Sequence, residues 1–243
     1  MQEPLLQLLE KLLQLMQSRF DIESIQPLLD ESPLRARFDL SDSNVELISR
    51  VWREQGVRWG IDTDMRHKYG GESKLFTWQL ARERTVLGWL LPDDKRTALW
   101  QQQLPWFGDV GQTEILARGQ QLIDCLIKHH SCWQSAASIS DWIARTRLLL
   151  RDIADADSLA GQAMQQLETS LGEWQAQADL AQFECLIEPE IAIEHLQNYL
   201  SGTRQAGFFT GWHYLLQYGA DAQSTLSLHL PTWSKRRRLP AYH

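Results

Sequence analysis

Charged residues early in the chain have the types and the order of a divalent-metal nuclease site. They are Asp62, Asp64, Glu72 and Lys74, in the pattern D-x-D…E-x-K. In nucleases of the restriction type, such carboxylates would hold the Mg²⁺ that activates water, and the lysine would stabilise developing charge. Such a site needs a sheet to present both arms of the pattern, whereas this segment offers at most a small hairpin around Gly70-Gly71. Because short matches are common by chance, a solvated charged loop is the competing interpretation.

A second set of potential ligands lies close together in the middle of the chain. Its members are Cys125, His129, His130 and Cys132. Their spacing matches no common structural zinc pattern, and Cys125 falls on the apolar face of an expected helix. We therefore interpret the cysteines as core thiols and the rest as a polar helix end, and we expect no metal there.

Sequence motifs for nucleotide binding and for common hydrolases are absent. None of the patterns G-x-x-x-x-G-K-[ST], G-x-G-x-x-G, H-E-x-x-H and G-x-S-x-G occurs. We therefore expect this chain to contain no catalytic residues and to bind no cofactor, ATP included. Its three cysteines include no C-x-x-C pair, so we expect no disulfide framework. We expect a cytoplasmic location instead, where thiols stay reduced.

The composition is that of a globular protein. The chain has 243 residues, of which 43% are hydrophobic and 23% charged, and its formal net charge is −7. This composition excludes intrinsic disorder for most of the chain. There is no run of 18 apolar residues that could span a membrane, and the N-terminus lacks the features of a signal peptide. The acidic balance gives no overall signature of nucleic-acid binding, although it leaves a local basic channel possible.

Hydrophobic periodicity indicates that helices position these residues. A first helix is expected from Pro4, with a stripe made of Leu5, Leu8, Leu9, Leu12, Leu15 and Met16. Further helices are expected after caps at Ser24, at Asp42 or Ser43 and at Ser140. Others are expected from Thr77, from Thr113, over residues 158–182 and from Pro189. Gly56 is expected to end one helix, Pro92 another, and the last ends before Gly202. The fold class predicted is all-α, with no strand of useful length before residue 200.

Three local strings of the sequence resemble one family. The first is Ser18-Arg19-Phe20, followed by Leu28-Leu29-Asp30 and Ala36-Arg37-Phe38-Asp39-Leu40. The second and most specific is Gly56-Val57-Arg58-Trp59-Gly60-Ile61-Asp62, and the third is Phe76-Thr77-Trp78 with Leu80, Arg84, Leu87 and Gly88. In order and spacing they resemble RecC, the gamma chain of exodeoxyribonuclease V (the RecBCD helicase–nuclease). Gln79, or its neighbour, replaces a glycine of the family pattern.

The resemblance covers residues 15–91 closely, and the helical character of the sequence extends it to about residue 209. RecC looks like a helicase that has lost its ATPase motifs, and the matching region is similar to a helical insertion, the counterpart of the 2B subdomain. The resemblance thus implies an irregular helical bundle. It also implies that the motif residues Arg58, Trp59, Gly60, Asp62, Thr77 and Trp78 are structural, with Arg58 and Asp62 as polar partners.

The same resemblance implies a role in a complex. RecC would hold RecB-like and RecD-like motor subunits and guide the split strands of a duplex DNA end during recombinational repair of double-strand breaks. ATP and Mg²⁺ would belong to the partner subunits. Two alternatives stay open: an autonomous Mg²⁺-dependent nuclease that uses the D-x-D…E-x-K residues, and a helical interaction module unrelated to DNA.

The end of the sequence differs from the rest. We divide the chain into a helical domain, residues 1–210, and a tail, residues 211–243, which has neither helical nor strand periodicity. Its basic run, Lys235 to Arg238, is interpreted as part of a disordered or foreign tail rather than as a nucleic-acid contact. Codons for the tail can be chosen so that the next reading frame contains P-M-R and then L-N-D-G-V-Y-P, which resemble the RecC continuation. We therefore expect an out-of-frame translation with no evolved function.

Overall fold

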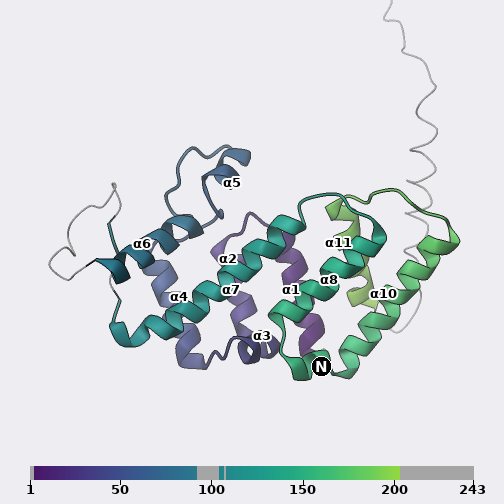
Figure 1. Ribbon diagram of the computed structural model, residues 1–243, viewed down its shortest axis with the longest axis horizontal. Helices are drawn as coiled ribbons and strands as arrows, with labels where there is room; N and C mark the ends of the chain where they lie inside the picture. Colours follow the sequence, from purple (N-terminus) through teal and green to yellow (C-terminus); the bar gives the residue numbers. More distant parts are fainter. Residues whose placement is uncertain (1–2, 92–103, 107, 203–243) are drawn as a thin grey trace, which may run out of the picture. The chain divides into compact units, whose positions relative to one another are not determined.

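The computed structural model describes residues 3–91, 104–106 and 108–202, which form helices and their connections (Figure 1). The elements are α1 (Pro4–Gln17), α2 (Ile22–Ile25), η1 (Gln26–Asp30), α3 (Ser32–Arg37), α4 (Asp42–Glu54), α5 (Thr63–Lys68), α6 (Trp78–Leu90), η3 (Val110–Gln112), α7 (Thr113–Cys132), α8 (Ile139–Ile153), α9 (Ala156–Leu159), α10 (Gln162–Leu180) and α11 (Pro189–Gly202). Within the described ranges, β pairing is limited to one isolated bridge between Ala137 and Ile187. The predicted all-α class is confirmed. The likeness to a helicase insertion stays a prediction.

Several predicted helix ends are confirmed. Helix α1 begins at Pro4, α7 begins at Thr113, and Thr77 caps α6. Gly56 follows α4 with a φ of +76°, the left-handed conformation expected of a glycine that ends a helix. The predicted stop at Pro92 and the predicted tail, residues 211–243, lie outside the described residues.

Other predicted helix starts are wrong by one to three residues. Asp21, not Ser24, caps α2, because its Oδ1 accepts a hydrogen bond from the Ser24 backbone N–H. In the same way Ser138, not Ser140, caps α8, and Ser41 caps α4. In each case two or three polar residues within a few positions fit a cap, and the backbone conformation decides which one is used. The long helix predicted over residues 158–182 is divided into α9 and α10.

Helix α1 lies in the centre of the core. Leu8, Leu9 and Leu12, which the predicted stripe contains, have no exposed surface. Leu6 and Leu13, outside that stripe, are buried as well. The reason is that α1 contacts α3, α7, α10 and α11, which together cover more than one side of it. The apolar face of α1 is therefore wider than the predicted stripe, while Gln14 and Gln17 stay exposed.

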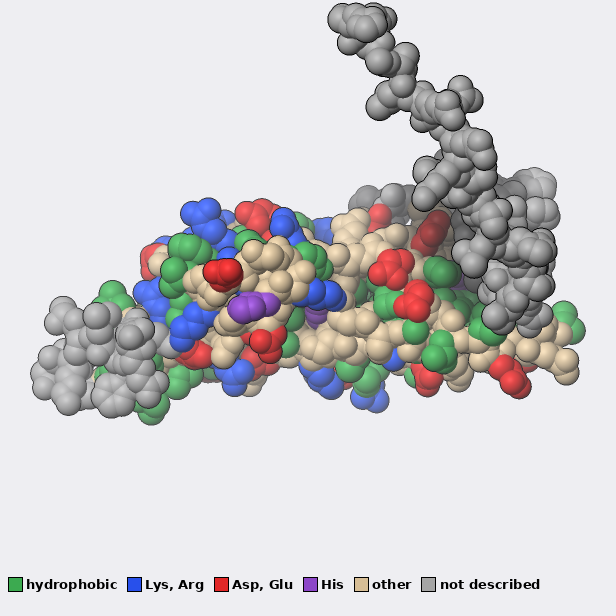
Figure 2. Space-filling view, turned by 90° about the horizontal axis from the view of Figure 1, so that it is seen from above, with side chains coloured by type: hydrophobic (Ala, Val, Ile, Leu, Met, Phe, Trp, Pro, Cys, Tyr) green, Lys and Arg blue, Asp and Glu red, His purple; other side chains and the backbone are tan. Residues whose placement is uncertain are grey.

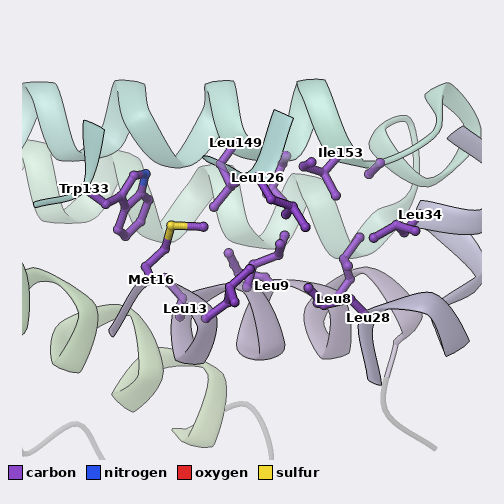
Figure 3. Close-up of a cluster of buried hydrophobic side chains, with 14 of the residues drawn as sticks. Leu8, Leu9, Leu13, Met16, Leu28, Leu34, Leu126, Trp133, Leu149 and Ile153 are labelled. Carbon is purple, nitrogen blue, oxygen red and sulfur yellow. The ribbon is translucent and has the colours of Figure 1, made fainter. Parts of the chain in front are cut away.

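Helices α7 and α8 pack against each other, and α7 also contacts α1. In Figure 3, Leu126 and Leu149 point from the upper helices toward Met16 and the α1 leucines. The two tryptophans at the end of this pair, Trp133 and Trp142, are fully buried and meet edge to face, with ring centroids 5.3 Å apart. This packing fixes the last turns of α7, which border the candidate site. No helix in the described ranges is both long enough and apolar enough to cross a membrane.

Candidate functional site

The three family-like strings are far apart in sequence but are joined by backbone hydrogen bonds. On one side of the middle string, the Gly60 N–H donates to the Arg19 carbonyl at 3.0 Å. On its other side, the Arg58 N–H donates to the Phe76 carbonyl at 2.9 Å. The middle string, residues 56–62, is therefore the centre of the arrangement, and we call it the RWG segment.

Thr77 and Trp78 fix the third string against this centre. Thr77 is buried, and its Oγ1 accepts a hydrogen bond from the Leu80 N–H at 3.2 Å, which caps α6. The Trp78 N–H donates to the Gly60 carbonyl at 3.1 Å. The Trp78 ring is buried edge to face against Trp52, with ring centroids 4.9 Å apart. Both residues thus have defined structural contacts.

Two arginines lie over the Trp59 ring. The guanidinium carbon of Arg66 is 4.0 Å from the centroid of the half-buried Trp59 ring, and that of Arg19 is 5.2 Å from it. Arg66 also donates from Nε and Nη2 to the Trp59 carbonyl, at 3.2 and 2.9 Å. Burial lowers the pKa of Arg66, although an arginine stays protonated at neutral pH. The ring and the carbonyl therefore stabilise a buried cation. Arg58 is exposed, with its guanidinium carbon 5.4 Å from the Phe76 ring centroid.

Both the backbone conformation at Gly60 and the close approach of Arg66 require a glycine at this position. Its φ is +86°, a conformation that L side chains rarely adopt. A Cβ atom added there would lie 3.2 Å from Nε of Arg66 and 3.3 Å from its Cγ. A larger residue at this position would thus displace the arginine that packs on Trp59.

The predicted nuclease residues have other contacts. Asp62 caps α5, with its Oδ1 accepting from the Met65 N–H at 2.8 Å. Asp64 and Glu72 are exposed, and Lys74 pairs with Glu83 at 3.6 Å. In the described part of the chain, these carboxylates do not form a cluster of three ligand atoms within 4.8 Å of one another.

The hairpin considered around Gly70-Gly71 is wrong. Two backbone hydrogen bonds, from Gly70 N–H to the His67 carbonyl and from Gly71 N–H to the Arg66 carbonyl, close the end of α5. Gly70 has a φ of +81°, which suits a helix C-terminus. The glycines thus end a helix instead of joining two strands, and the two arms of the D-x-D…E-x-K pattern have no sheet to align them.

A cleft of about 360 Å³ lies between the α5 region and the end of α7. Its lining includes Asp62, Asp64, Lys68 and Tyr69 on one side and Ile127, His130, Ser131 and Gln134 on the other. Burial lowers the pKa of His130, so its imidazole is neutral at pH 7. The lining therefore offers carboxylates, a lysine and uncharged polar groups to a partner surface.

The surface around α5 and α6 carries many charged side chains. Figure 2 shows Lys and Arg side chains gathered over this part of the molecule, with Asp and Glu among them. Its exposed basic residues include Arg58, His67, Lys68, Lys74 and Arg82.

The interpretation of the central cysteines and histidines is partly wrong. Cys132 is exposed rather than a core thiol, and Cys125 is half-buried. His129 and His130 are both buried, and His130 Nε2 lies 3.4 Å from the backbone carbonyl of Ser18 in the first family-like string. His130 meets Phe20 edge to face, with ring centroids 5.4 Å apart.

One potential ligand was missed by the sequence interpretation. Asp152 of α8 lies beside Cys125 and His129 of α7, and the ligand atoms of all three lie within 4.8 Å of one another. Asp152 is 23 residues from His129 and belongs to another helix. No local spacing could have indicated it.

Comparison with known proteins gives one consistent family. Residues 2–204 match the family described as the RecBCD enzyme subunit RecC fourth domain. Among curated relatives, RecBCD enzyme subunit RecC of Escherichia coli is 28% identical over 178 residues, 71% of this chain and 15% of the relative. The RecC subunit of Mycolicibacterium smegmatis is 33% identical over 96 residues, 40% of this chain and 9% of the relative. That of Haemophilus influenzae is 28% identical over 142 residues, 58% of this chain and 12% of the relative.

The chain thus spans 9–15% of the length of these relatives. The match to the domain family nevertheless covers all of the described residues. It includes all three strings that meet at the RWG segment. The chain therefore belongs to the RecC family, and residues 2–204 correspond to its fourth domain.

Proposed function

We propose that this chain acts as a non-catalytic, helical part of a RecC subunit. In the complete RecBCD assembly it would brace the RecB-like and RecD-like motor subunits and help to guide the separated strands of a broken DNA end. The assembly would unwind and degrade DNA in recombinational repair. The observation that carries this proposal is the family match over residues 2–204.

The geometry of the RWG segment supports a bracing role. Its backbone is hydrogen-bonded on both sides, to Arg19 and to Phe76. Its tryptophan ring contacts two arginines, and its aspartate caps a helix. Side chains with such contacts serve to position the elements around them. The exposed basic residues near α5 and α6 are of the types that contact DNA phosphates.

The division of labour follows from the proposal. ATP and Mg²⁺ would be bound by the partner subunits, in the cytoplasm, and this chain would need no cofactor for bracing. The duplex end and the single strands would be contacted only as part of the complex.

Assembly tests the proposal directly. The tagged chain is co-expressed with the RecB and RecD subunits encoded in the same genome. Partners captured on the tag are identified by mass spectrometry. We expect both subunits to be captured. A Gly60→Trp variant, which must displace Arg66, should capture less than a Gly172→Ala variant, whose added Cβ meets nothing within 4 Å. Capture of neither subunit would instead favour an interaction module unrelated to DNA.

The nuclease alternative has its own test. The purified chain is incubated with Mg²⁺ and with linear single- and double-stranded DNA, alongside its Glu72→Ala variant. We expect no cleavage by either protein. Mg²⁺-dependent cleavage that the substitution abolishes would contradict the non-catalytic role.

A further inference from the structure

Away from the RWG segment, α7 and α8 bring together a thiol, an imidazole and a carboxylate. Ligand atoms of Cys125, His129 and Asp152 all lie within 4.8 Å of one another. Cys125 and His129 are four residues apart and so share one face of α7. Asp152 projects from the last turn of α8, which packs against α7. In the described ranges, no other three histidine, cysteine or acidic side chains are grouped as closely.

The spacing suits a tetrahedral metal ion. His129 Nε2 lies 3.1 Å from Asp152 Oδ2. With metal–nitrogen and metal–oxygen bonds of about 2.0 Å, two ligand atoms of a tetrahedral zinc site are separated by roughly 3.3 Å. A sulfur ligand at about 2.3 Å from the metal would lie roughly 3.5 Å from the nitrogen. Small rotations of these side chains would therefore bring all three onto one ion.

The surroundings hold the ligands in place but leave an entry path. The His129 side chain is almost fully buried, and Cys125 is half-buried. The Asp152 side chain keeps 20% of its surface exposed. An ion could thus enter beside the carboxylate, where a water molecule would complete its coordination.

We propose that Cys125, His129 and Asp152 form a Zn²⁺ site that ties α7 to α8. A thiolate and an imidazole favour Zn²⁺ over Mg²⁺ or Ca²⁺, which prefer oxygen ligands. On binding, the Cys125 thiol would release its proton to solvent. His129 would present an unprotonated Nε2 to the ion, with its remaining proton on Nδ1.

Without the ion, basic side chains pair with the Asp152 carboxylate, and the Cys125 thiol keeps its proton. Lys128 Nζ lies 3.1 Å from Asp152 Oδ2, and Arg151 Nε lies 3.6 Å from Oδ1. Burial and the nearby carboxylate raise the pKa of the Cys125 thiol. A protonated thiol is a poor nucleophile, which disfavours a Cys–His–Asp catalytic triad. Zn²⁺ must displace Lys128 from Oδ2, so Lys128 competes with the metal.

Cobalt substitution tests the site in the full 243-residue chain. Co²⁺ is titrated into the purified protein at pH 7.5, and the thiolate-to-cobalt charge-transfer band and the visible d–d bands are recorded. We expect one equivalent to bind, with bands that Zn²⁺ abolishes. Cys125→Ser should remove the charge-transfer band, and Asp152→Asn should weaken binding at least about tenfold.

Matched variants make the result decisive. Cys132→Ser and Cys185→Ser, at the two exposed cysteines, should leave the spectrum unchanged. Lys128→Ala, which removes the competing cation, should tighten binding, and circular dichroism verifies that each variant keeps its helices. The proposal is overturned if the band persists in Cys125→Ser, if it disappears in either control, or if neither the parent nor Lys128→Ala shows it.

Discussion

The indole N–H of Trp78 donates to the backbone carbonyl of Phe20 at 2.9 Å, joining residues that are 58 positions apart. Both side chains are buried, with ring centroids 6.2 Å apart in an edge-to-face arrangement. Phe20 has a φ of +56°, a conformation that costs a bulky residue about 1–3 kcal/mol. The strained turn at Phe20 aims its carbonyl at the indole, so the first and third family-like strings are held together across the RWG segment.

Trp78→Phe removes this donor and keeps an aromatic ring. We expect the free energy of unfolding to fall by about 1–3 kcal/mol, because the buried Phe20 carbonyl loses its partner. Urea unfolding followed by circular dichroism measures the change. Trp89→Phe is the control, since Trp89 is 40% exposed and should change stability by less than about 0.5 kcal/mol. Equal effects of the two substitutions would argue against the hydrogen bond.

Gly60→Ala probes the close approach of Arg66. We expect a loss of about 1–3 kcal/mol, because alanine is strained at positive φ and its Cβ would crowd the guanidinium stem. Gly70→Ala has the same backbone problem at a φ of +81° but meets nothing within 4 Å, so it should cost less. Thermal unfolding of both variants separates backbone strain from crowding. If Gly70→Ala is the more destabilising, the role given to Arg66 is wrong.

Asp62 distinguishes a helix cap from a metal ligand. Asp62→Ala should lower stability by about 0.5–2 kcal/mol, whereas Asp62→Asn keeps a capping oxygen and should lower it less. Asp64→Ala, at an exposed position, should have an effect within about 0.5 kcal/mol. Melting temperatures are compared with and without Mg²⁺. A Mg²⁺-dependent stabilisation that both alanine variants lose would support the nuclease site instead.

His195 makes the fold sensitive to acid. It stacks on Trp174, with ring centroids 4.3 Å apart, and burial lowers its pKa from 6.5 to about 4. Between these two pH values the unfolded chain binds a proton that the folded chain does not. The contribution of His195 to the free energy of unfolding is therefore fully present above pH 6.5 and is lost as the pH falls toward 4. From pH 7 to pH 5 this histidine alone should lower the free energy of unfolding by about 2 kcal/mol.

His195→Phe keeps a stacked ring but cannot take up a proton. Urea unfolding of parent and variant at pH 7 and pH 5 should therefore show a smaller acid loss in the variant. Burial also lowers the pKa values of His129 and His130, but these groups are present in both proteins, so the difference isolates His195. An identical acid loss in the two proteins would refute the prediction.

The nucleotide sequence tests the prediction for residues 211–243. We expect the next reading frame over this region to encode P-M-R followed by L-N-D-G-V-Y-P, after a T-rich run at the codons of Phe208 and Phe209. Sequencing the locus gives the result. A frame without these strings would refute the out-of-frame origin.

Local patterns in the sequence determined much of the helical framework. The apolar spacing after Pro4 and the helix starts at Thr77 and Thr113 depend on residues within one or two turns, and these predictions are confirmed. Gly56 likewise marks a helix end because few other residues adopt its conformation. The family-like strings could also be identified without a structure.

Only the tertiary structure decided which distant residues meet. The hydrogen bond from Gly60 to Arg19, the stacking of Arg66 on Trp59 and the approach of Asp152 to His129 all join different elements. The D-x-D…E-x-K pattern is the opposite case, since neighbours in sequence are used separately, as a helix cap and as an ion pair. Periodicity reports which face of a helix is apolar, whereas the packing of α7 against α8 and α1 selects the partners that this face meets.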